Sequence, residues 1–143
     1  MTDLEINALK IENQLCFPLY VASKEVINKY NPLLKSVGLT YTQYITMLAL
    51  WEYACLPVKQ LGDILDLDSG TITPVVKKLE EKGYVTRIRE HVDERNVSVS
   101  LTKEGLALRE KLKNVPFEIA KCMNLTAEEA QTLYNLLHKV IGK

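Results

Sequence analysis

The chain has 143 residues, of which 47% are hydrophobic and 25% charged, with 18 basic side chains balancing 18 acidic ones. This composition is typical of one globular domain and excludes a disordered or fibrous chain. No apolar run approaches the roughly 20 residues that cross a bilayer, and the opening segment is too acidic for a secretory signal, so we expect a cytoplasmic protein with no membrane partner.

The chain has three cysteines, Cys16, Cys55 and Cys122, which form no Cys-x-x-Cys pair. An odd number of widely spaced cysteines fits neither a secreted disulfide framework nor a zinc site. We therefore expect free thiols in the resting state, with no metal and no cofactor. The zero net charge gives no support for nucleic-acid binding, because such domains usually carry an excess of Lys and Arg. Charge has to be judged locally.

The first part of the chain is predicted to be helical. Apolar residues at three- and four-residue steps indicate a helix over 11–34, in which Pro18 marks a kink or a restart. Thr40 is suited to cap a second helix over 41–53. The predicted buried residues of that helix are Tyr44, Leu48 and Trp51.

Two shorter helices follow. Pro57 opens one over 58–65, and residues 67–70 form a predicted tight turn. Ser69 is the predicted cap of the next helix, which runs to about residue 82 and is stopped by Gly83. Two short helices joined by a tight turn are the helix-turn-helix pattern.

Beyond Gly83 the sequence pattern changes to that of β-strands. Residues 84–89 and 96–101 are alternating or rich in β-branched side chains, and they predict a hairpin with a charged loop at 90–95. A hairpin that follows a helix-turn-helix is a wing. The predicted fold class is therefore mainly α with a small β-hairpin wing, a winged helix-turn-helix.

The C-terminal part is again helical. Thr102 caps a predicted helix whose apolar stripe continues despite Pro116, and Thr126 with Glu129 forms a capping box for the last helix. We expect one domain over 1–143, with a DNA-binding core at 41–101 and dimerisation helices at 1–36 and 102–143. The core is too small to cover all the terminal stripes, which favours a homodimer over a monomer with folded-back helices.

The helix over 69–82 carries the best candidate surface for DNA. Ile72, Val76 and Leu79 share one face, so the opposite face is small and polar near its start. Short hydroxyls there can reach bases or phosphates, and hairpin cations suit phosphates and a minor groove. The candidate DNA-binding residues are Ser69, Gly70, Thr71, Thr73, Pro74, Lys77, Arg87, Arg89 and Arg95. The alternative is a solvated helix beside a hairpin without function.

With these residues in place, the chain resembles the MarR family of winged-helix repressors over nearly its whole length. The most specific mark is the run Asp93-Glu94-Arg95 followed by Leu101-Thr102, which is similar to the family's wing signature. That resemblance implies that Asp93 positions the hairpin and that Arg95 enters the minor groove.

Two further stretches resemble the OhrR-like branch, which senses organic hydroperoxides. They are Asn13-Gln14-Leu15-Cys16-Phe17 with Tyr20, and the run 67–74. The resemblance implies that Cys16 is oxidised to a sulfenic acid and then to a disulfide, and that Tyr30 and Tyr41 hydrogen-bond its sulfur. It also implies that Cys122 matches the resolving cysteine of two-cysteine members, with a bridge to the other subunit. A low-molecular-weight thiol is the alternative partner. Pro18 departs from the family pattern.

A physical argument for Cys16 stands beside the resemblance. A helix that restarts near Pro18 leaves Cys16 close to its positive end, which favours the thiolate, and tyrosine hydroxyls can donate to the sulfur once the second helix packs on the first. The alternative is a small buried hydrophobic residue, the usual role of a free cysteine and the one expected of Cys55.

The resulting prediction is a repressor rather than an enzyme. The reduced dimer should bind a pseudo-palindromic operator, and oxidation should lower its affinity by shifting the helices that support the wings. A MarR-type sensor of a phenolic or other small ligand is the closest alternative. A thiol peroxidase that uses Cys16 and an interaction module without DNA are more distant ones.

Overall fold

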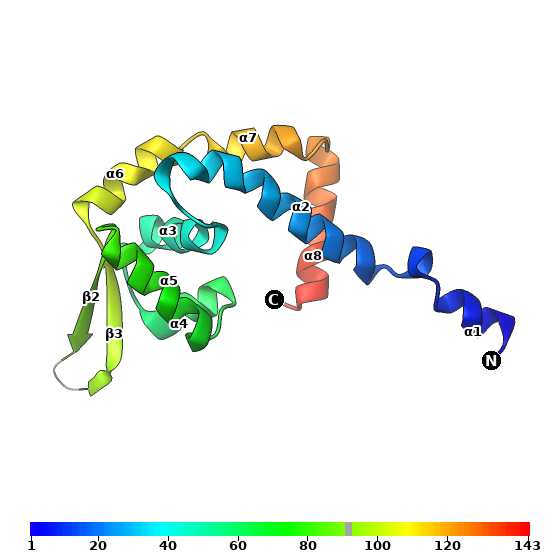
Figure 1. The fold of residues 1–143 in the computed structure, drawn as a ribbon, viewed down its shortest axis with the longest axis horizontal. Helices are drawn as coiled ribbons and strands as arrows, with labels where there is room; N and C mark the ends of the chain where they lie inside the picture. Colours follow the sequence, from blue (N-terminus) through cyan, green and yellow to red (C-terminus); the bar gives the residue numbers. More distant parts are fainter. Residues whose placement is uncertain (91–92) are drawn as a thin grey trace. The chain divides into compact units, whose positions relative to one another are not determined.

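Residues 41–101 form the predicted winged helix-turn-helix in the computed structural model of the protein (Figure 1). The structure describes the backbone of residues 1–90 and 93–143 and the side chains of 1–89 and 96–143. The helices are α1 (Asp3–Ala8), α2 (Cys16–Leu34), α3 (Tyr41–Tyr53), α4 (Val58–Leu65), α5 (Ser69–Glu81), α6 (Lys103–Leu112), α7 (Val115–Cys122) and α8 (Ala127–Ile141), and the strands are β1 (Cys55–Pro57), β2 (Val85–Glu90) and β3 (Asp93–Leu101).

The chain divides into two compact units. The central unit is Tyr30–Lys113, and the terminal unit consists of Met1–Lys29 and Asn114–Lys143. The central unit therefore includes the end of α2 and the whole of α6, besides the core that the sequence predicts at 41–101. The predicted division of labour between a DNA-binding core and dimerisation helices stays a prediction.

The helix-turn-helix is built on local signals that the sequence displays. Thr40 caps α3 in a capping box with Gln43, as predicted for this threonine, and Pro57 directly precedes α4. At the turn, Gly62 lies so close to the Leu67 carbonyl that an added Cβ would come within 2.7 Å of it. A glycine is needed there for α4 and α5 to approach each other.

Within the central unit, one hydrophobic core holds α3, α4, α5 and the sheet together. Met47, Leu50, Leu61 and Leu79 are fully buried, and Val99 of β3 is buried with them. Burying a side chain of this kind contributes about 1.5–3 kcal/mol relative to leaving it exposed, so this core is the main source of stability of the unit. The prediction that Leu48 is buried was wrong, because 41% of it is exposed in the single chain.

The wing belongs to a three-stranded antiparallel sheet rather than to an isolated hairpin. The strand order is β1-β3-β2, with Leu56 opposite Val99 and Val99 opposite Arg87. The strand β1 was not predicted from the sequence, because it has only three residues and ends at Pro57. The hairpin strands also extend further than predicted, because β2 ends at Glu90 and β3 begins at Asp93.

Two predicted helices near the ends of the chain begin or end elsewhere in the structure. A short 3₁₀ turn at Ile11–Asn13 precedes α2, which begins at Cys16, so Pro18 lies in the first helical turn. Amides of the first turn have no intrahelical partner, and a proline therefore costs little there. The helix predicted to pass through Pro116 ends at Leu112, and α7 begins at Val115 for the same reason. The Thr102 cap and the Thr126–Glu129 capping box are as predicted.

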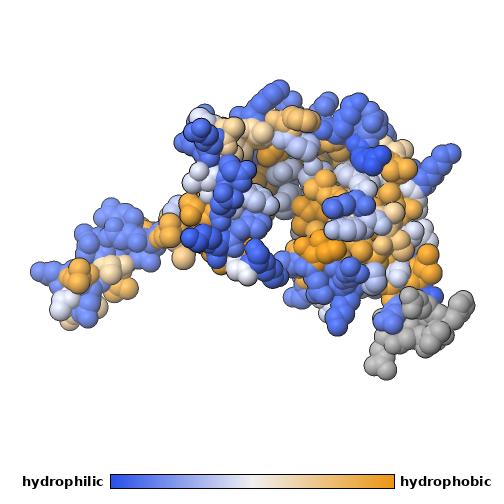
Figure 2. Space-filling view, turned by 180° about the vertical axis from the view of Figure 1, so that it is seen from behind, coloured by the Kyte–Doolittle hydropathy of each residue, from blue (hydrophilic) through white to orange (hydrophobic). Residues whose placement is uncertain are grey.

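Apolar side chains remain exposed mainly on the terminal unit. Examples are Leu9 at 70%, Leu15 at 76%, Phe117 at 68% and Val140 at 69% of full exposure. Figure 2 shows apolar patches between the hydrophilic side chains of the N-terminal segment. Among the residues that the structure describes, none belongs to a helix that is long and apolar enough to cross a membrane.

Candidate nucleic-acid interface and reactive cysteines

The first turn of α5 presents short polar residues to solvent. Ser69, Gly70 and Thr71 are exposed. The cap is Asp68 rather than the predicted Ser69, since the Thr71 amide donates to Asp68 Oδ1 at 2.9 Å and Ser69 is the first helical residue. The Asp68 carboxylate thus partly satisfies the positive end of the helix, which leaves the hydroxyls as the contacts best placed for DNA.

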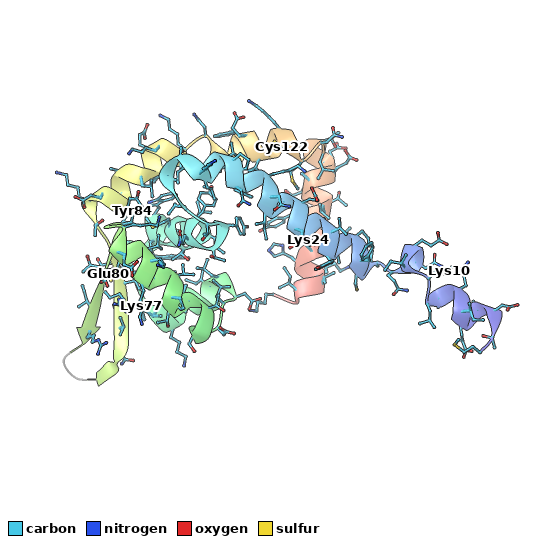
Figure 3. The ribbon with its side chains drawn as sticks, in the orientation of Figure 1. Lys10, Lys24, Lys77, Glu80, Tyr84 and Cys122 are labelled. Atoms are coloured by element: carbon cyan, nitrogen blue, oxygen red, sulfur yellow. The ribbon has the colours of Figure 1, made fainter. Side chains whose placement is uncertain are left out.

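Further along α5 the outer face stays open. Pro74 and Lys77 are exposed and Thr73 is half-buried, while Ile72 and Val76 on the inner face are buried, as the sequence pattern predicts. Pro74 has no amide hydrogen to donate to the Gly70 carbonyl, so this face carries a backbone acceptor without its helical donor. Lys77 lies on α5 one turn before Glu80 (Figure 3).

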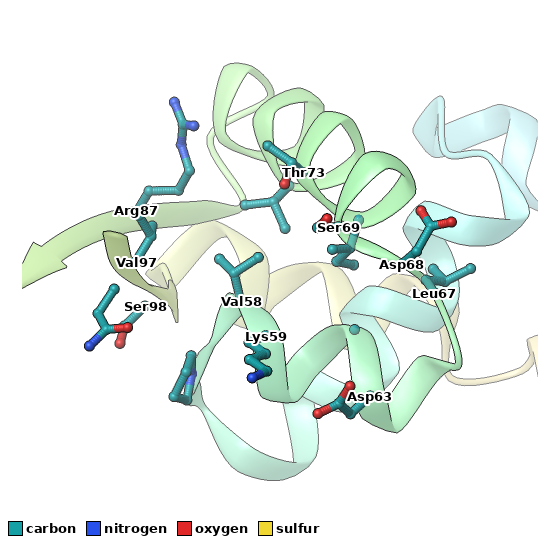
Figure 4. Close-up of a pocket in the computed structure, with 15 residues that line it drawn as sticks. Val58, Lys59, Asp63, Leu67, Asp68, Ser69, Thr73, Arg87, Val97 and Ser98 are labelled. Atoms are coloured by element: carbon teal, nitrogen blue, oxygen red, sulfur yellow. The ribbon is translucent and has the colours of Figure 1, made fainter. Parts of the chain in front are cut away.

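A groove of about 700 Å³ separates α5 from the wing and from α4. Ser69 and Thr73 line it from α5, Lys59 from α4, and Arg87 and Ser98 from the sheet (Figure 4). Hydroxyls, a lysine and the polar face of α5 thus border one hollow of the central unit. As the second helix of the helix-turn-helix, α5 is called the recognition helix below.

Arg87 is engaged within the protein. Its amide donates to Glu80 Oε2 at 2.8 Å, its Nε donates to Glu80 Oε1 at 3.0 Å, and a guanidinium nitrogen lies 3.0 Å from the same oxygen. These bonds, led by the one from the Arg87 amide, lower the pKa of the Glu80 carboxyl. Arg87 was predicted as a phosphate-binding cation, and its partner Glu80 was not predicted from the sequence.

Three further residues of the wing were predicted to contact DNA. Arg89 is exposed on β2, two residues beyond Arg87 and on the same face of the strand. The side chains of Asp93 and Arg95, the predicted wing-signature residues, lie outside the described part of the chain.

Three tyrosines form a cluster in the central unit. The Tyr30 ring, near the end of α2, lies 4.9 Å from the Tyr41 ring and 5.6 Å from the Tyr44 ring, both on α3. Burial and the neighbouring tyrosines raise the pKa of Tyr44 to about 12, and burial raises that of Tyr30. The structure thus brings the predicted pair together. Tyr44 was predicted only as a core residue.

The cysteines are exposed and unpaired in the single chain. Cys16 is the first residue of α2. Cys122 is the last residue of α7 (Figure 3). Cys55 begins β1 opposite Ser100. Exposure does not fit the packing role expected of Cys55. Over the described residues, no cluster of three or more metal-ligating side chains occurs.

Comparison with known proteins identifies the family of the chain. Residues 28–112 match the transcriptional regulator SarA/Rot family, a MarR-like winged-helix group. The chain belongs to the SarA/Rot family. The matched segment contains the tyrosine cluster, the helix-turn-helix and the wing, and family membership confirms both the predicted winged-helix fold and the predicted role as a regulator rather than an enzyme.

Curated relatives are similar to this chain over nearly its whole length. The organic hydroperoxide resistance transcriptional regulator of Bacillus subtilis is 43% identical, and the HTH-type transcriptional regulator SarZ of Staphylococcus epidermidis is 45% identical. Each alignment covers 93% of this chain and 90% of the relative.

Solved structures of AbfR from Staphylococcus epidermidis share the fold at 32% identity. Reduced AbfR bound to DNA matches with a TM-score of 0.81 over 99% of this SarA/Rot chain and 98% of that one. Overoxidised AbfR bound to DNA matches with 0.78 over 96% and 97%, and disulfide-formed AbfR with 0.66 over 99% of both chains.

Proposed function

We propose that this protein is a cytoplasmic, homodimeric transcription regulator that represses by binding a pseudo-palindromic operator when reduced and releases it when Cys16 is oxidised by an organic hydroperoxide. The observation that carries the proposal is the exposed Cys16 at the first position of α2, in a chain that is 43% identical to a hydroperoxide-resistance regulator. That relative's name favours oxidant sensing over the alternative of a phenolic ligand.

The position of Cys16 suits its proposed chemistry. The N-terminal turn of a helix stabilises a thiolate, and the exposed sulfur is accessible to a peroxide. The thiolate attacks the terminal hydroperoxide oxygen, the O–O bond breaks, a sulfenic acid forms and the alkoxide leaves to be protonated to an alcohol. The thiolate of Cys122 then attacks the sulfenic sulfur, the S–S bond forms, the S–O bond breaks, and the leaving hydroxide takes up a proton from solvent to become water.

The tyrosine donors of Cys16 come from the partner subunit in this proposal. Tyr30 follows Cys16 by fourteen residues on the same helix, which corresponds to about 21 Å at 1.5 Å per residue. A hydroxyl of the same chain cannot bridge that distance. Tyr30 of the partner subunit can meet Cys16 if the two copies of α2 run antiparallel, and Tyr41 of the partner subunit follows because the two rings are in contact.

A disulfide is the oxidised species to which we assign operator release. Structures of AbfR bound to DNA exist for its reduced and overoxidised forms, and its disulfide form is a separate structure. By analogy, a Cys16–Cys122 bridge between subunits constrains α2 against α7 of the partner and changes the separation of the recognition helices.

The test of the function is operator binding by fluorescence anisotropy, with DNA from upstream of the protein's own gene. Reduced wild type, Cys16→Ser and the control Cys55→Ser should all bind. After cumene hydroperoxide, wild type and Cys55→Ser should release the DNA, and Cys16→Ser should keep it. Release by oxidised Cys16→Ser would overturn the assignment of the sensor.

The disulfide is tested separately by non-reducing electrophoresis after the same oxidation. Wild type and Cys55→Ser should run as covalent dimers, whereas Cys122→Ser should run as a monomer. Because its Cys16 can only be capped by another thiol or overoxidised, Cys122→Ser treated without added thiol should keep its DNA. A monomer band for oxidised wild type would exclude the bridge.

A further inference from the structure

The contact between Glu80 and Arg87 joins the recognition helix to the wing. Glu80 lies in the last turn of α5, and Arg87 lies on β2, the edge strand of the sheet. Three other ion pairs of the described residues, Lys78–Glu81, Glu110–Lys113 and Glu118–Lys121, each join side chains three residues apart in or at the end of one helix, and these side chains are largely exposed. The Glu80–Arg87 pair is less exposed, at 33% and 30%.

The Glu80–Arg87 pair is held by more than one hydrogen bond. Both carboxylate oxygens of Glu80 accept hydrogen bonds from Arg87, one from the backbone amide at the free edge of β2 and the other from the guanidinium. A bidentate arrangement that includes a backbone donor fixes the direction of both elements, which a single exposed ion pair does not. The carboxylate also offsets the positive charge of Arg87 beside the groove.

We propose that Glu80 is a positioning residue that fixes the wing against the recognition helix and holds Arg87 as an internal anchor instead of a cation that neutralises a DNA phosphate. This inference rests on the proposed DNA binding. It leaves Arg89, exposed on the same face of β2, as the phosphate-binding cation of that strand.

The salt dependence of operator affinity shows whether Arg87 is an internal anchor or a cation that neutralises a DNA phosphate. Each neutralised phosphate contributes about −0.9 to the slope of log affinity against log salt concentration, and a residue of a symmetric dimer counts twice. Arg87→Gln should therefore weaken binding several-fold at every salt concentration and leave the slope unchanged. The matched control Arg89→Gln should make the slope shallower by about 2.

The complementary variant is Glu80→Gln, which retains an acceptor but removes the negative charge. It frees the guanidinium, so the slope should become steeper by up to about 2, an effect that a purely structural role would not produce. Arg87→Lys keeps the charge without the bidentate geometry and should weaken binding with an unchanged slope. If Arg87→Gln does not fold, as judged by thermal unfolding, the slope of Glu80→Gln carries the test.

Two results would overturn the inference: a slope that becomes shallower by about 2 in Arg87→Gln, or one that is unchanged in Glu80→Gln. Both presuppose that reduced wild type binds its operator with a measurable slope. Absence of binding by wild type would instead contradict the proposed function itself, so the two failures are distinguishable.

Discussion

At the scale of single residues, the reactivity of Cys16 depends on its immediate surroundings. Cys16 owes its position at the start of α2 to Pro18, which a helix accepts in its first turn but not further on. The sequence predicted a kink or a restart at Pro18, because the signal is local, and the structure shows the restart. From the sequence, the tyrosines were expected to reach the sulfur once the second helix packs on the first, whereas the length of the continuous helix supports the proposed donors from the partner subunit.

Removing one tyrosine hydroxyl should slow the oxidation of Cys16. In Tyr41→Phe the ring contact with Tyr30 is kept and one donor to the thiolate is lost, so the rate of thiol loss with cumene hydroperoxide should fall several-fold. Tyr53→Phe, at the exposed end of α3, is the control. Stopped-flow measurement of the reduced protein gives the rate, and equal rates for Tyr41→Phe and wild type would argue against the tyrosine contact.

At the scale of elements, the features predicted correctly depend on residues close together in the chain, and the features that were missed depend on residues far apart or on how two elements meet. Thr40, Thr102 and Thr126 cap helices through bonds three residues away, and each was predicted. The strand β1 was missed, since its pairing partner lies more than forty residues later in the chain. Glu80 was missed for a similar reason: its bond to Arg87 depends on the angle between a helix and a strand, which no sequence period encodes.

Gly105 in α6 shows how closely the elements approach. An added Cβ would lie 2.1 Å from the Tyr84 carbonyl oxygen, and the Gly105 carbonyl accepts a hydrogen bond from the Trp51 ring at 2.8 Å. Gly105→Ala should therefore destabilise the fold by about 1–3 kcal/mol through overpacking. Thermal unfolding measures the effect.

The control for that substitution is Gly70→Ala. A Cβ at Gly70 would only make an ordinary contact of 3.4 Å with Asp68 Oδ1, and alanine favours a helix over glycine by about 1 kcal/mol. Its melting temperature should equal or exceed that of wild type. Equal melting temperatures for Gly105→Ala and Gly70→Ala would contradict the close packing of α6 on the Tyr84 turn.

At the scale of the whole molecule, the exposed apolar residues of the terminal unit require a cover. Val140 of α8 is 69% exposed in the single chain, in contrast to the fully buried core of the central unit. The sequence predicted this difference through stripes that the core could not cover. It could not predict which residues touch the second copy.

A charge at this surface should dissociate the homodimer. Val140→Asp places a carboxylate among apolar side chains, so sedimentation at micromolar concentration should show a shift from dimer toward monomer. Ile64→Asp, which alters an exposed apolar residue of α4 in the central unit, should remain dimeric. Dimers of equal stability in both variants would exclude α8 from the interface.

If oxidation of Cys16 controls DNA binding, the two events can be followed together in one titration. Operator-bound protein is treated with increasing amounts of hydroperoxide, and the fraction of Cys16 in a disulfide, from mass spectrometry, is compared with the fraction of DNA released. We expect the two fractions to rise together. Release of DNA while Cys16 remains a thiol, or full disulfide formation with the DNA still bound, would contradict it.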